Sequence, residues 1–214
     1  MSDLDLLEHQ LRPAGGDPEG ALVLMHGRGA DELDLLPLLD ALDPGRRLAG
    51  VVPRAPLALP PGGFHWYISR RVGYPDGETF LATYGTLQRF TAALPSALGV
   101  PWSRTVIGGF SMGAVMSYAL TLGSGRPAPA ALLAFSGFIP TVDGFELEWS
   151  NVRGLPVAIG HGTHDPVIPV EFGRAARRAV EKADARVLYR ESPMVHAIDP
   201  RFVRALQGWL EEVV

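Results

Sequence analysis

The chain has 214 residues, which suffice for one hydrophobic core but not for two complete domains, so we expect residues 1–214 to form a single domain. Hydrophobic residues make up 47% and charged residues 20%, values that are typical of a globular protein and exclude a disordered or fibrous chain. The net charge of −4 offers no positive field for nucleic acid, and the lack of cysteine excludes disulfides and thiolate nucleophiles.

The chain contains no apolar stretch near the ~20 residues that a membrane span needs. Its first residues are acidic and lack the basic and apolar regions of a secretory leader. We therefore expect a cytoplasmic protein without stable membrane insertion. The sequence leaves open whether the chain forms a homodimer.

Short apolar runs alternate with helical patterns, which predicts an α/β fold with a mostly parallel central sheet and helices on both faces. A weak strand is expected near residues 6–11. Further strands are expected at residues 21–26, 48–52, 105–110, 130–135, 157–159 and 186–189. Helices are expected at about residues 35–42, 77–94, 112–122, 170–182 and 200–213, with Asp199 as the cap of the last one.

The segment Gly109-Phe-Ser-Met-Gly113 lies between an apolar strand and an apolar helix. In this context a serine sits in a sharp, strained turn, and a glycine two residues away on each side lets strand and helix approach closely. The hydroxyl then projects at the carboxyl ends of the strands, where open α/β sheets hold their ligands. Ser111 is therefore the candidate nucleophile.

A serine nucleophile needs backbone donors for the oxyanion of the tetrahedral intermediate, each worth on the order of 3–4 kcal/mol. One expected donor is the N–H of Met112, directly after the serine. The other is the N–H of Arg28, because the glycines on either side of it permit a tight turn after the first apolar strand. We expect His26 to be a structural hydrogen-bonding residue.

A serine hydroxyl becomes nucleophilic when an imidazole takes its proton and a carboxylate fixes the tautomer of that imidazole. Around such a turn the chain order is serine, then acid, then histidine. Asp165 follows the strand at residues 157–159, and His196 lies between the last strand and the last helix. Both are therefore expected at the same edge of the sheet as Ser111.

His161 and His164, close to Asp165 in the sequence, raise a metal site as an alternative. The segment lacks the His-x-x-x-His spacing of a helical zinc site, and there is no further cluster of ligands. No metal and no other cofactor is expected.

Blocks spread over nearly the whole chain resemble the phospholipase/carboxylesterase family of α/β-hydrolases, which includes the acyl-protein thioesterases. These blocks are residues 22–30, 53–56, 109–113, 136–140 and 162–167, followed by His196. The resemblance implies the α/β-hydrolase fold and esterase or thioesterase activity without a cofactor. It also implies a triad and two oxyanion donors at the positions already named, which are Ser111, Asp165 and His196, and Arg28 and Met112.

The chain departs from the usual pattern of this family at two positions. The family usually has glutamine after the nucleophile and glycine before the histidine, where this chain has Met112 and Val195. The backbone N–H of Met112 does not depend on its side chain, so the chemistry is expected to survive.

Apolar walls with few polar groups suit an acyl chain. The segment from residue 137 to residue 154 is too short for a large cap domain, so we expect an open groove and a small-molecule ester with a short or medium acyl chain. The expected substrate-binding residues are Phe64, Trp66, Phe138, Ile139 and Val167, although a core position for Trp66 and Phe138 stays open.

Three functions are compatible with the sequence. The first is a serine carboxylesterase that works through an acyl-enzyme intermediate. The second keeps the fold but acts on thioesters or lysophospholipids, or with peroxide. The third is a ligand-binding protein without turnover, against which the complete triad argues.

Overall fold

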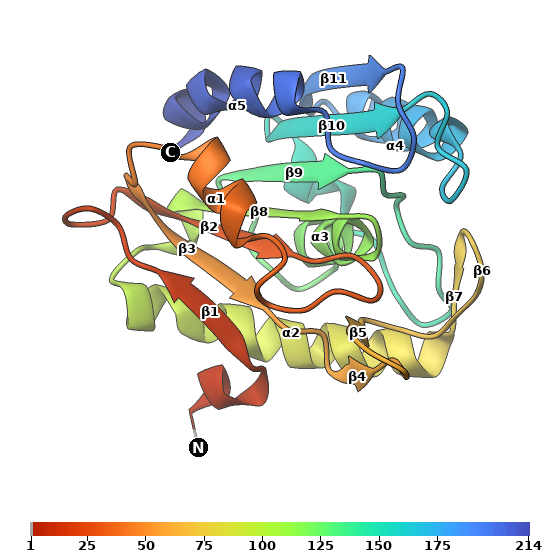
Figure 1. Ribbon diagram of the computed structural model, residues 1–214, viewed down its shortest axis with the longest axis horizontal. Helices are drawn as coiled ribbons and strands as arrows, with labels where there is room; N and C mark the ends of the chain where they lie inside the picture. The colour runs from red at the N-terminus through yellow and green to blue at the C-terminus, as the bar shows by residue number, and fades with distance from the viewer. Residues whose placement is uncertain (1) are drawn as a thin grey trace.

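A seven-stranded sheet forms the centre of the computed structural model, which describes residues 2–214 (Figure 1). The strand order is β1-β3-β2-β8-β9-β10-β11. The bounds are β1 (His9–Arg12), β2 (Gly20–Met25), β3 (Leu48–Pro53), β8 (Thr105–Phe110), β9 (Ala131–Phe135), β10 (Pro156–Gly162) and β11 (Arg186–Ser192). Only β1, at one edge, is antiparallel to its neighbour. The predicted mostly parallel sheet is confirmed.

Two of the predicted strands are longer than their apolar runs, and one is displaced. β10 and β11 stay paired as far as Gly162 and Ser192, because a ladder of backbone hydrogen bonds does not require apolar side chains. The weak strand expected near residues 6–11 is present as β1, with later bounds. Residues Asp3–Leu6 instead form a 3₁₀ helix, η1, capped by the side chain of Ser2, and β1 begins only at His9.

Helices cover both faces of the sheet. They are α1 (Leu36–Leu42), α2 (Gly77–Leu98), α3 (Met112–Leu122), α4 (Val170–Lys182) and α5 (Pro200–Val213). Successive side chains of a strand point to opposite faces. In β2, Leu22 accordingly packs in the cluster that α1 and α5 cover, whereas Val23 packs in the cluster beneath α2 and α3. A third cluster joins α3 and α4 to β9 and β10.

Helix α2 continues past Pro95, where the sequence pattern predicts its end. Proline inside a helix removes one backbone hydrogen bond and strains the preceding turn. Leu98 nevertheless packs against the core cluster, and Gly99 ends the helix in the left-handed conformation at φ 67°. The contact of this last turn with the core therefore outweighs the local cost of the proline.

Several short elements were not predicted, because they are too short to show a periodic pattern of hydrophobic residues. They are the paired strands β4 (Leu57–Ala58) and β5 (Phe64–His65), the paired strands β6 (Ser69–Arg71) and β7 (Tyr74–Pro75), and the 3₁₀ helices η2 (Trp102–Arg104) and η3 (Trp149–Val152).

The strand order reverses at β2, since β3 lies on one side of it and β8 on the other. Ligands of open α/β sheets bind outside the carboxyl ends of the strands at such a point. In Figure 1 the arrows of β8, β9, β10 and β11 point the same way, and the loops that follow them lie on that side. The topology thus selects one edge of the sheet for the site.

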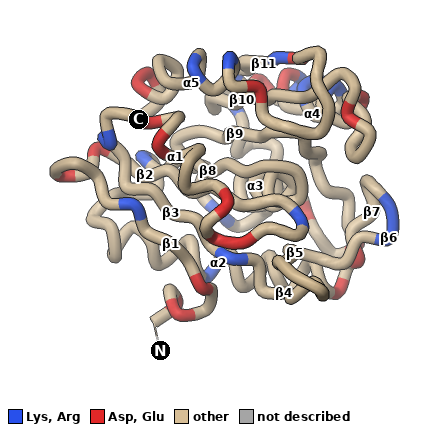
Figure 2. Tube along the Cα trace, viewed as in Figure 1, with Lys and Arg blue, Asp and Glu red and all other residues tan. Residues whose placement is uncertain are grey.

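Acidic and basic residues are interspersed along the chain (Figure 2). Between residues 2 and 214, no helix combines the length and the apolar character that a membrane crossing requires.

The end of β2, the turn after β8 and the first turn of α3 pack backbone against backbone. A Cβ atom added to Gly109 would lie 2.6 Å from the carbonyl oxygen of Met25. A Cβ added to Gly113 would overlap the same carbonyl group. Glycine is therefore required at both positions by close approach.

Gly113→Ala is expected to lower the free energy of unfolding by about 1–3 kcal/mol or more, because the new methyl group meets rigid backbone. Urea unfolding followed by circular dichroism measures the change. Gly85→Ala is the matched control in the middle of α2, where an added Cβ meets nothing within 4 Å. It should stabilise the protein by about 0.5–1 kcal/mol, and equal stabilities of the two variants would contradict the close packing.

Candidate active site

Ser111 occupies the turn between β8 and α3 with φ 55° and ψ −119°, a conformation that few non-glycine residues adopt. Such strain costs of order 1–3 kcal/mol and persists only where the surroundings enforce it. Here the Ser111 N–H donates to the carbonyl of Phe135 at 2.8 Å, and its own carbonyl accepts from Val115 at 3.2 Å. The turn is therefore held from the neighbouring strand and from the helix.

The imidazole of His196 lies between the side chains of Ser111 and Asp165. Its Nε2 is 2.8 Å from Ser111 Oγ, and its Nδ1 is 2.6 Å from Asp165 Oδ2. An ionised carboxylate only accepts hydrogen bonds, so the proton of the neutral ring sits on Nδ1. Nε2 is then free to accept the hydroxyl proton of Ser111. The three residues predicted from chain order are thus brought together in the geometry of a nucleophile, a base and an orienting acid.

The carboxylate of Asp165 is buried and accepts hydrogen bonds at both oxygens. Oδ1 accepts from the backbone N–H groups of Val167 and Ile168, both at 2.8 Å, and Oδ2 accepts from His196. These bonds close a tight loop directly after β10. The acid therefore presents a fixed orientation to the imidazole.

His161 supports the loop that carries the acid. Burial lowers the pKa of its imidazole, so the ring is neutral. Its Nε2 donates to the carbonyl of Ile168 at 2.8 Å and lies 3.6 Å from Asp165 Oδ2. The backbone N–H of His164 donates to Met194, which links the loop of Asp165 to the loop of His196. Among residues 2–214, no three His, Cys, Asp or Glu side chains gather in a way that could hold a metal ion.

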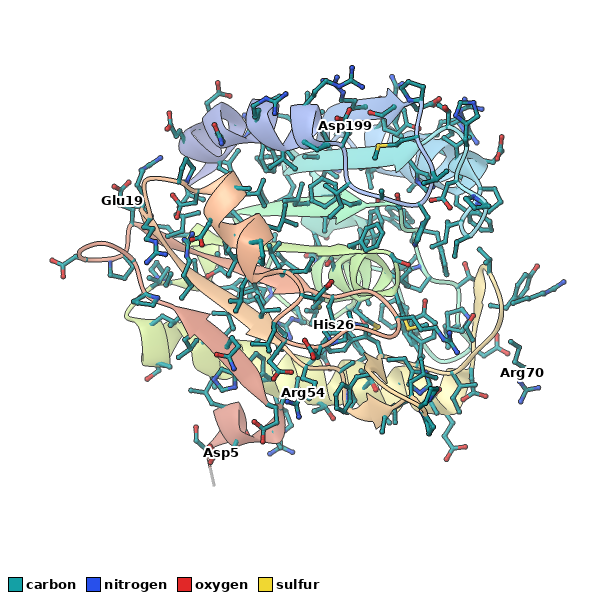
Figure 3. All side chains as sticks on the ribbon, viewed as in Figure 1. Asp5, Glu19, His26, Arg54, Arg70 and Asp199 are labelled. Atoms are coloured by element: carbon teal, nitrogen blue, oxygen red, sulfur yellow. The ribbon has the colours of Figure 1, made fainter. Side chains whose placement is uncertain are left out.

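The loop that carries His196 is closed at its base by Ser192 and Asp199. The Ser192 hydroxyl donates to Asp199 Oδ2 at 2.5 Å, and Asp199 Oδ1 accepts from the N–H of Arg201 at 2.8 Å, as predicted for the cap of α5. The hydrogen bond from Ser192 is the largest cause that lowers the pKa of Asp199 to about 2. Figure 3 labels Asp199 beside the start of α5. An ionised Asp199 thus holds both ends of the loop.

The two residues that depart from the usual family pattern fit this structure. Val195 has no left-handed backbone conformation, so glycine is not required there, and its side chain is exposed. Met112 is buried and joins the core cluster beneath α2 and α3. Its backbone N–H belongs to the first turn of α3, where helix geometry provides no acceptor.

The loop after β2 lies against the nucleophile. A Cβ added to Gly27 would lie 3.5 Å from the Cβ of Ser111, so the N–H of Arg28 belongs to a segment next to the hydroxyl. Between residues 2 and 214 this N–H has no backbone acceptor. The adjacent N–H of Gly29 donates to the carbonyl of Phe64 at 2.8 Å, which fixes the turn.

His26 positions this loop from the interior, near the centre of the molecule in Figure 3. Its Nε2 accepts from the N–H of Ala55 at 3.0 Å, and its Nδ1 donates to the carbonyl of Gly27 at 2.7 Å. Burial lowers the pKa of His26, which keeps the ring neutral and able to make both bonds. The expectation of a structural histidine agrees with these contacts.

An ion pair holds the far end of the same loop. Arg54, labelled in Figure 3, binds both oxygens of the buried carboxylate of Glu32, and its guanidinium lies 4.7 Å from the ring centre of Phe64. These hydrogen bonds from Arg54 are the main reason that the pKa of Glu32 is lowered. Phe64 is half-buried beneath this pair.

The residues expected to bind the substrate do not form one wall. Trp66 was expected to bind the substrate, but it is a core residue. Its side chain has no exposed surface, and its Nε1 donates to the carbonyl of His26 at 2.8 Å. Phe138 is also a core residue, with its ring 5.4 Å from that of Phe172. Ile139 is half-buried, and Val167 is exposed. An indole or phenyl ring serves a core and a pocket equally well, so the sequence did not distinguish the two.

Sequence reasoning missed a groove between α1 and α5, which has a volume of about 650 Å³ and includes His196 in its lining. Its walls include Leu35, Leu38, Phe110, His196 and Ile198. The ring of Phe110 lies 4.7 Å from the imidazole. Phe110 comes directly before Ser111 in the sequence, and this position could have indicated that it lies near the site. The pairing of α1 with α5 was not visible in the sequence.

The comparison with protein families decides the assignment. The family model for phospholipase/carboxylesterase matches residues 10–214. The chain belongs to the phospholipase/carboxylesterase family. Like this family, it is a serine hydrolase that acts on esters or thioesters, and its fold is that of the α/β-hydrolases.

Relatives of known name support this assignment. Acyl-protein thioesterase 1 of Candida albicans is 28% identical over 178 residues, which cover 75% of this chain and 76% of the relative. The protein of the same name from Yarrowia lipolytica is 26% identical over 217 residues and 94% of each chain.

Solved structures agree on the fold. The carboxylesterase of Bacillus cereus superposes with a TM-score of 0.85 at 22% identity, over 100% of both chains. Esterase PE8 superposes with a TM-score of 0.82 at 26% identity, over 97% of this chain and 99% of that one. The cytoplasmic location stays a prediction from the sequence, and the question of a homodimer stays open.

Asp199→Asn is expected to lower kcat by roughly tenfold to a hundredfold, because the loop of His196 loses its anchor and small displacements of a base are costly. The variant should also lose about 2 kcal/mol of stability near neutral pH. The pKa of Asp199 is lowered in the folded protein, so this contribution is complete above the ordinary pKa near 3.8 and disappears as the pH falls toward about 2.

Ester hydrolysis and urea unfolding at several pH values measure both effects. Asp17→Asn, at an exposed position, is the control and should change neither. A stability difference that persists unchanged at pH values near the lowered pKa of Asp199 would contradict the role of this ionised carboxylate.

Proposed function

We propose that this protein is a carboxylesterase that hydrolyses short- to medium-chain carboxylic esters through an acyl-enzyme intermediate on Ser111. One observation carries the proposal, the continuous hydrogen-bonded line from Asp165 through His196 to Ser111. The free backbone donors expected at Arg28 and Met112, beside that hydroxyl, support it.

In the first half of the reaction His196 Nε2 takes the proton of Ser111 Oγ as this oxygen attacks the ester carbonyl carbon. The carbonyl oxygen becomes an oxyanion that the N–H groups of Arg28 and Met112 stabilise. The imidazolium then gives its proton to the alcohol oxygen as the C–O bond breaks. Water repeats the sequence on the acyl-enzyme and releases the carboxylic acid.

The preference for short and medium acyl chains rests on the lack of a large cap. Residues 137–154 hold only the short helix η3 (Trp149–Val152), which is too little for a large cap. Val167, exposed beside the acid, is the expected substrate contact with the most open surface. Long acyl chains would stay partly in water and gain less from binding.

A thioester is the second candidate substrate, because the relatives from Candida albicans and Yarrowia lipolytica are named acyl-protein thioesterases. A thiol is more acidic than an alcohol and needs less help from a general acid as it leaves. Values of kcat/KM for an oxygen ester and a thioester with the same acyl group will rank the two functions.

Ser111→Ala and His196→Ala are each expected to lower kcat for p-nitrophenyl butyrate by about ten-thousand-fold or more, because nucleophile and base act as one unit. Asp165→Asn should lose about as much, since the imidazole then adopts the wrong tautomer. Stopped-flow and steady-state assays measure these losses. Ser124→Ala, at an exposed position, is the matched control. Substantial activity in Ser111→Ala would refute the proposed nucleophile.

The oxyanion donors are tested by changing the backbone at residue 28. Arg28→Pro removes the N–H and is expected to lower kcat by about a hundredfold to a thousandfold. Arg28→Ala keeps the N–H and should retain most of kcat. Circular dichroism and urea unfolding verify that both variants are folded. Equal losses in both variants would assign the effect to the side chain instead.

A further inference from the structure

The groove between α1 and α5 begins at the imidazole of His196. His196, Ala197 and Ile198 line its near end, and the ring of Phe110 forms a wall that the groove shares with the nucleophile turn. Both α1 and α5 start at the carboxyl edge of the sheet, and they pack side by side on one face (Figure 1). The groove thus begins at the catalytic base and at Phe110, the residue directly before Ser111.

The groove is open to solvent, and its lining is mostly apolar. Leu38 of α1 and Val203 of α5 belong to its lining, and the charged side chains are those of Asp34 and Arg204. Gln207 Nε2 donates to the carbonyl of Ala41 at 2.8 Å and joins the two helices at the far end of the groove. The lining residues of α5 run from Pro200 to Gln207, which corresponds to ~10 Å along the helix axis. This length suits a linear chain of several carbon atoms.

The chemistry of acyl transfer decides which part of an ester can reach this groove. The tetrahedral carbon carries the serine oxygen, the oxyanion, the first carbon of the acyl chain and the leaving oxygen. The leaving oxygen must lie within hydrogen-bonding reach of His196 Nε2, because that atom gives it the proton. The oxyanion points away from the imidazole, toward the N–H groups of Arg28 and Met112. The carbon chain on the leaving oxygen therefore starts at the mouth of the groove.

We propose that the groove between α1 and α5 binds the alcohol part of the ester, and that it makes the enzyme select esters of medium-chain primary alcohols. This assignment rests on the proposed function. The acyl chain is directed to the opposite side, toward Val167. The same groove then binds an added alcohol that attacks the acyl-enzyme in place of water, since this step is the reverse of alcohol release.

Partition of one acyl-enzyme between water and an added alcohol tests the groove without changing the acyl group. The acetyl-enzyme is formed from p-nitrophenyl acetate in the presence of methanol or of 1-hexanol at equal concentration. The acetate ester and free acetic acid are then quantified by gas chromatography. The wild-type protein is expected to transfer the acetyl group to hexanol at least about tenfold better than to methanol, because each buried methylene group adds to binding.

Two variants fill the groove at different depths. Leu38→Trp fills it nearer the start of α1, and therefore nearer the carboxyl edge of the sheet, and is expected to reduce the preference for hexanol to less than about threefold. Ala41→Trp fills only the far end of the groove, at an exposed helix position that tolerates a large side chain. It should reduce transfer to hexanol, relative to methanol, more than transfer to 1-butanol relative to methanol. Transfer to water in the same reaction serves as the internal reference.

Leu188→Trp is the matched control. Leu188 is a partly exposed residue of β11 in a separate groove that includes Pro156 and Trp209, near the amino ends of the strands. This variant should keep the wild-type partition and the wild-type rate. A p-nitrophenyl ester series of rising acyl length, run on every variant, should show the same length preference as the wild type.

An unchanged preference for hexanol in Leu38→Trp and Ala41→Trp would overturn the proposal. A changed acyl-length preference in these variants would also overturn it, because the groove would then hold the acyl chain. If the proposed function itself is wrong, the experiments give a different result. In that case Ser111→Ala keeps its activity, and no acyl-enzyme is trapped at that residue.

Discussion

The catalytic geometry depends on a steric constraint, the packing of three backbone segments around Gly109 and Gly113. The end of β2 lies so close to these glycines that no side-chain atom fits between them. Ser111, between them, is held at φ 55° by bonds to β9 and α3, so its side chain is available at the carboxyl edge. The same approach brings the loop after β2 against the serine and leaves the first N–H groups of α3 near it.

Burial divides the histidines of the site between structural and chemical roles. Desolvation lowers the pKa of His26 and His161, so each ring stays neutral and donates one hydrogen bond to a backbone carbonyl. His26 thereby holds the loop of Arg28, one of the two proposed oxyanion donors, and His161 holds the loop of Asp165. His196 is less buried and lies on a loop that the Ser192–Asp199 hydrogen bond closes. A rigid frame thus surrounds one accessible base.

The two sides of the nucleophile differ in construction. On one side, Trp66 and Phe138 support the loops from within the core, and Val167 offers the exposed apolar surface. On the other side, α1 and α5 form the walls of an open groove that begins at His196. A serine hydrolase needs separate space for the acyl and alcohol parts of its substrate, because the two leave the site at different steps. This asymmetry is the physical basis for assigning one part to each side.

The sequence by itself determined the features that depend on local order. The glycines around Ser111, the chain order of Asp165 and His196, and the cap at Asp199 each follow from short-range sterics or from strand-to-loop connection. Tertiary structure alone decided the features that depend on long-range packing. A buried contact of Leu98 extends α2 past Pro95, the core takes up Trp66, and α1 meets α5 to form the groove. The hydrophobicity of a side chain predicts that it is buried, but only the packing of distant segments determines which residues cover it.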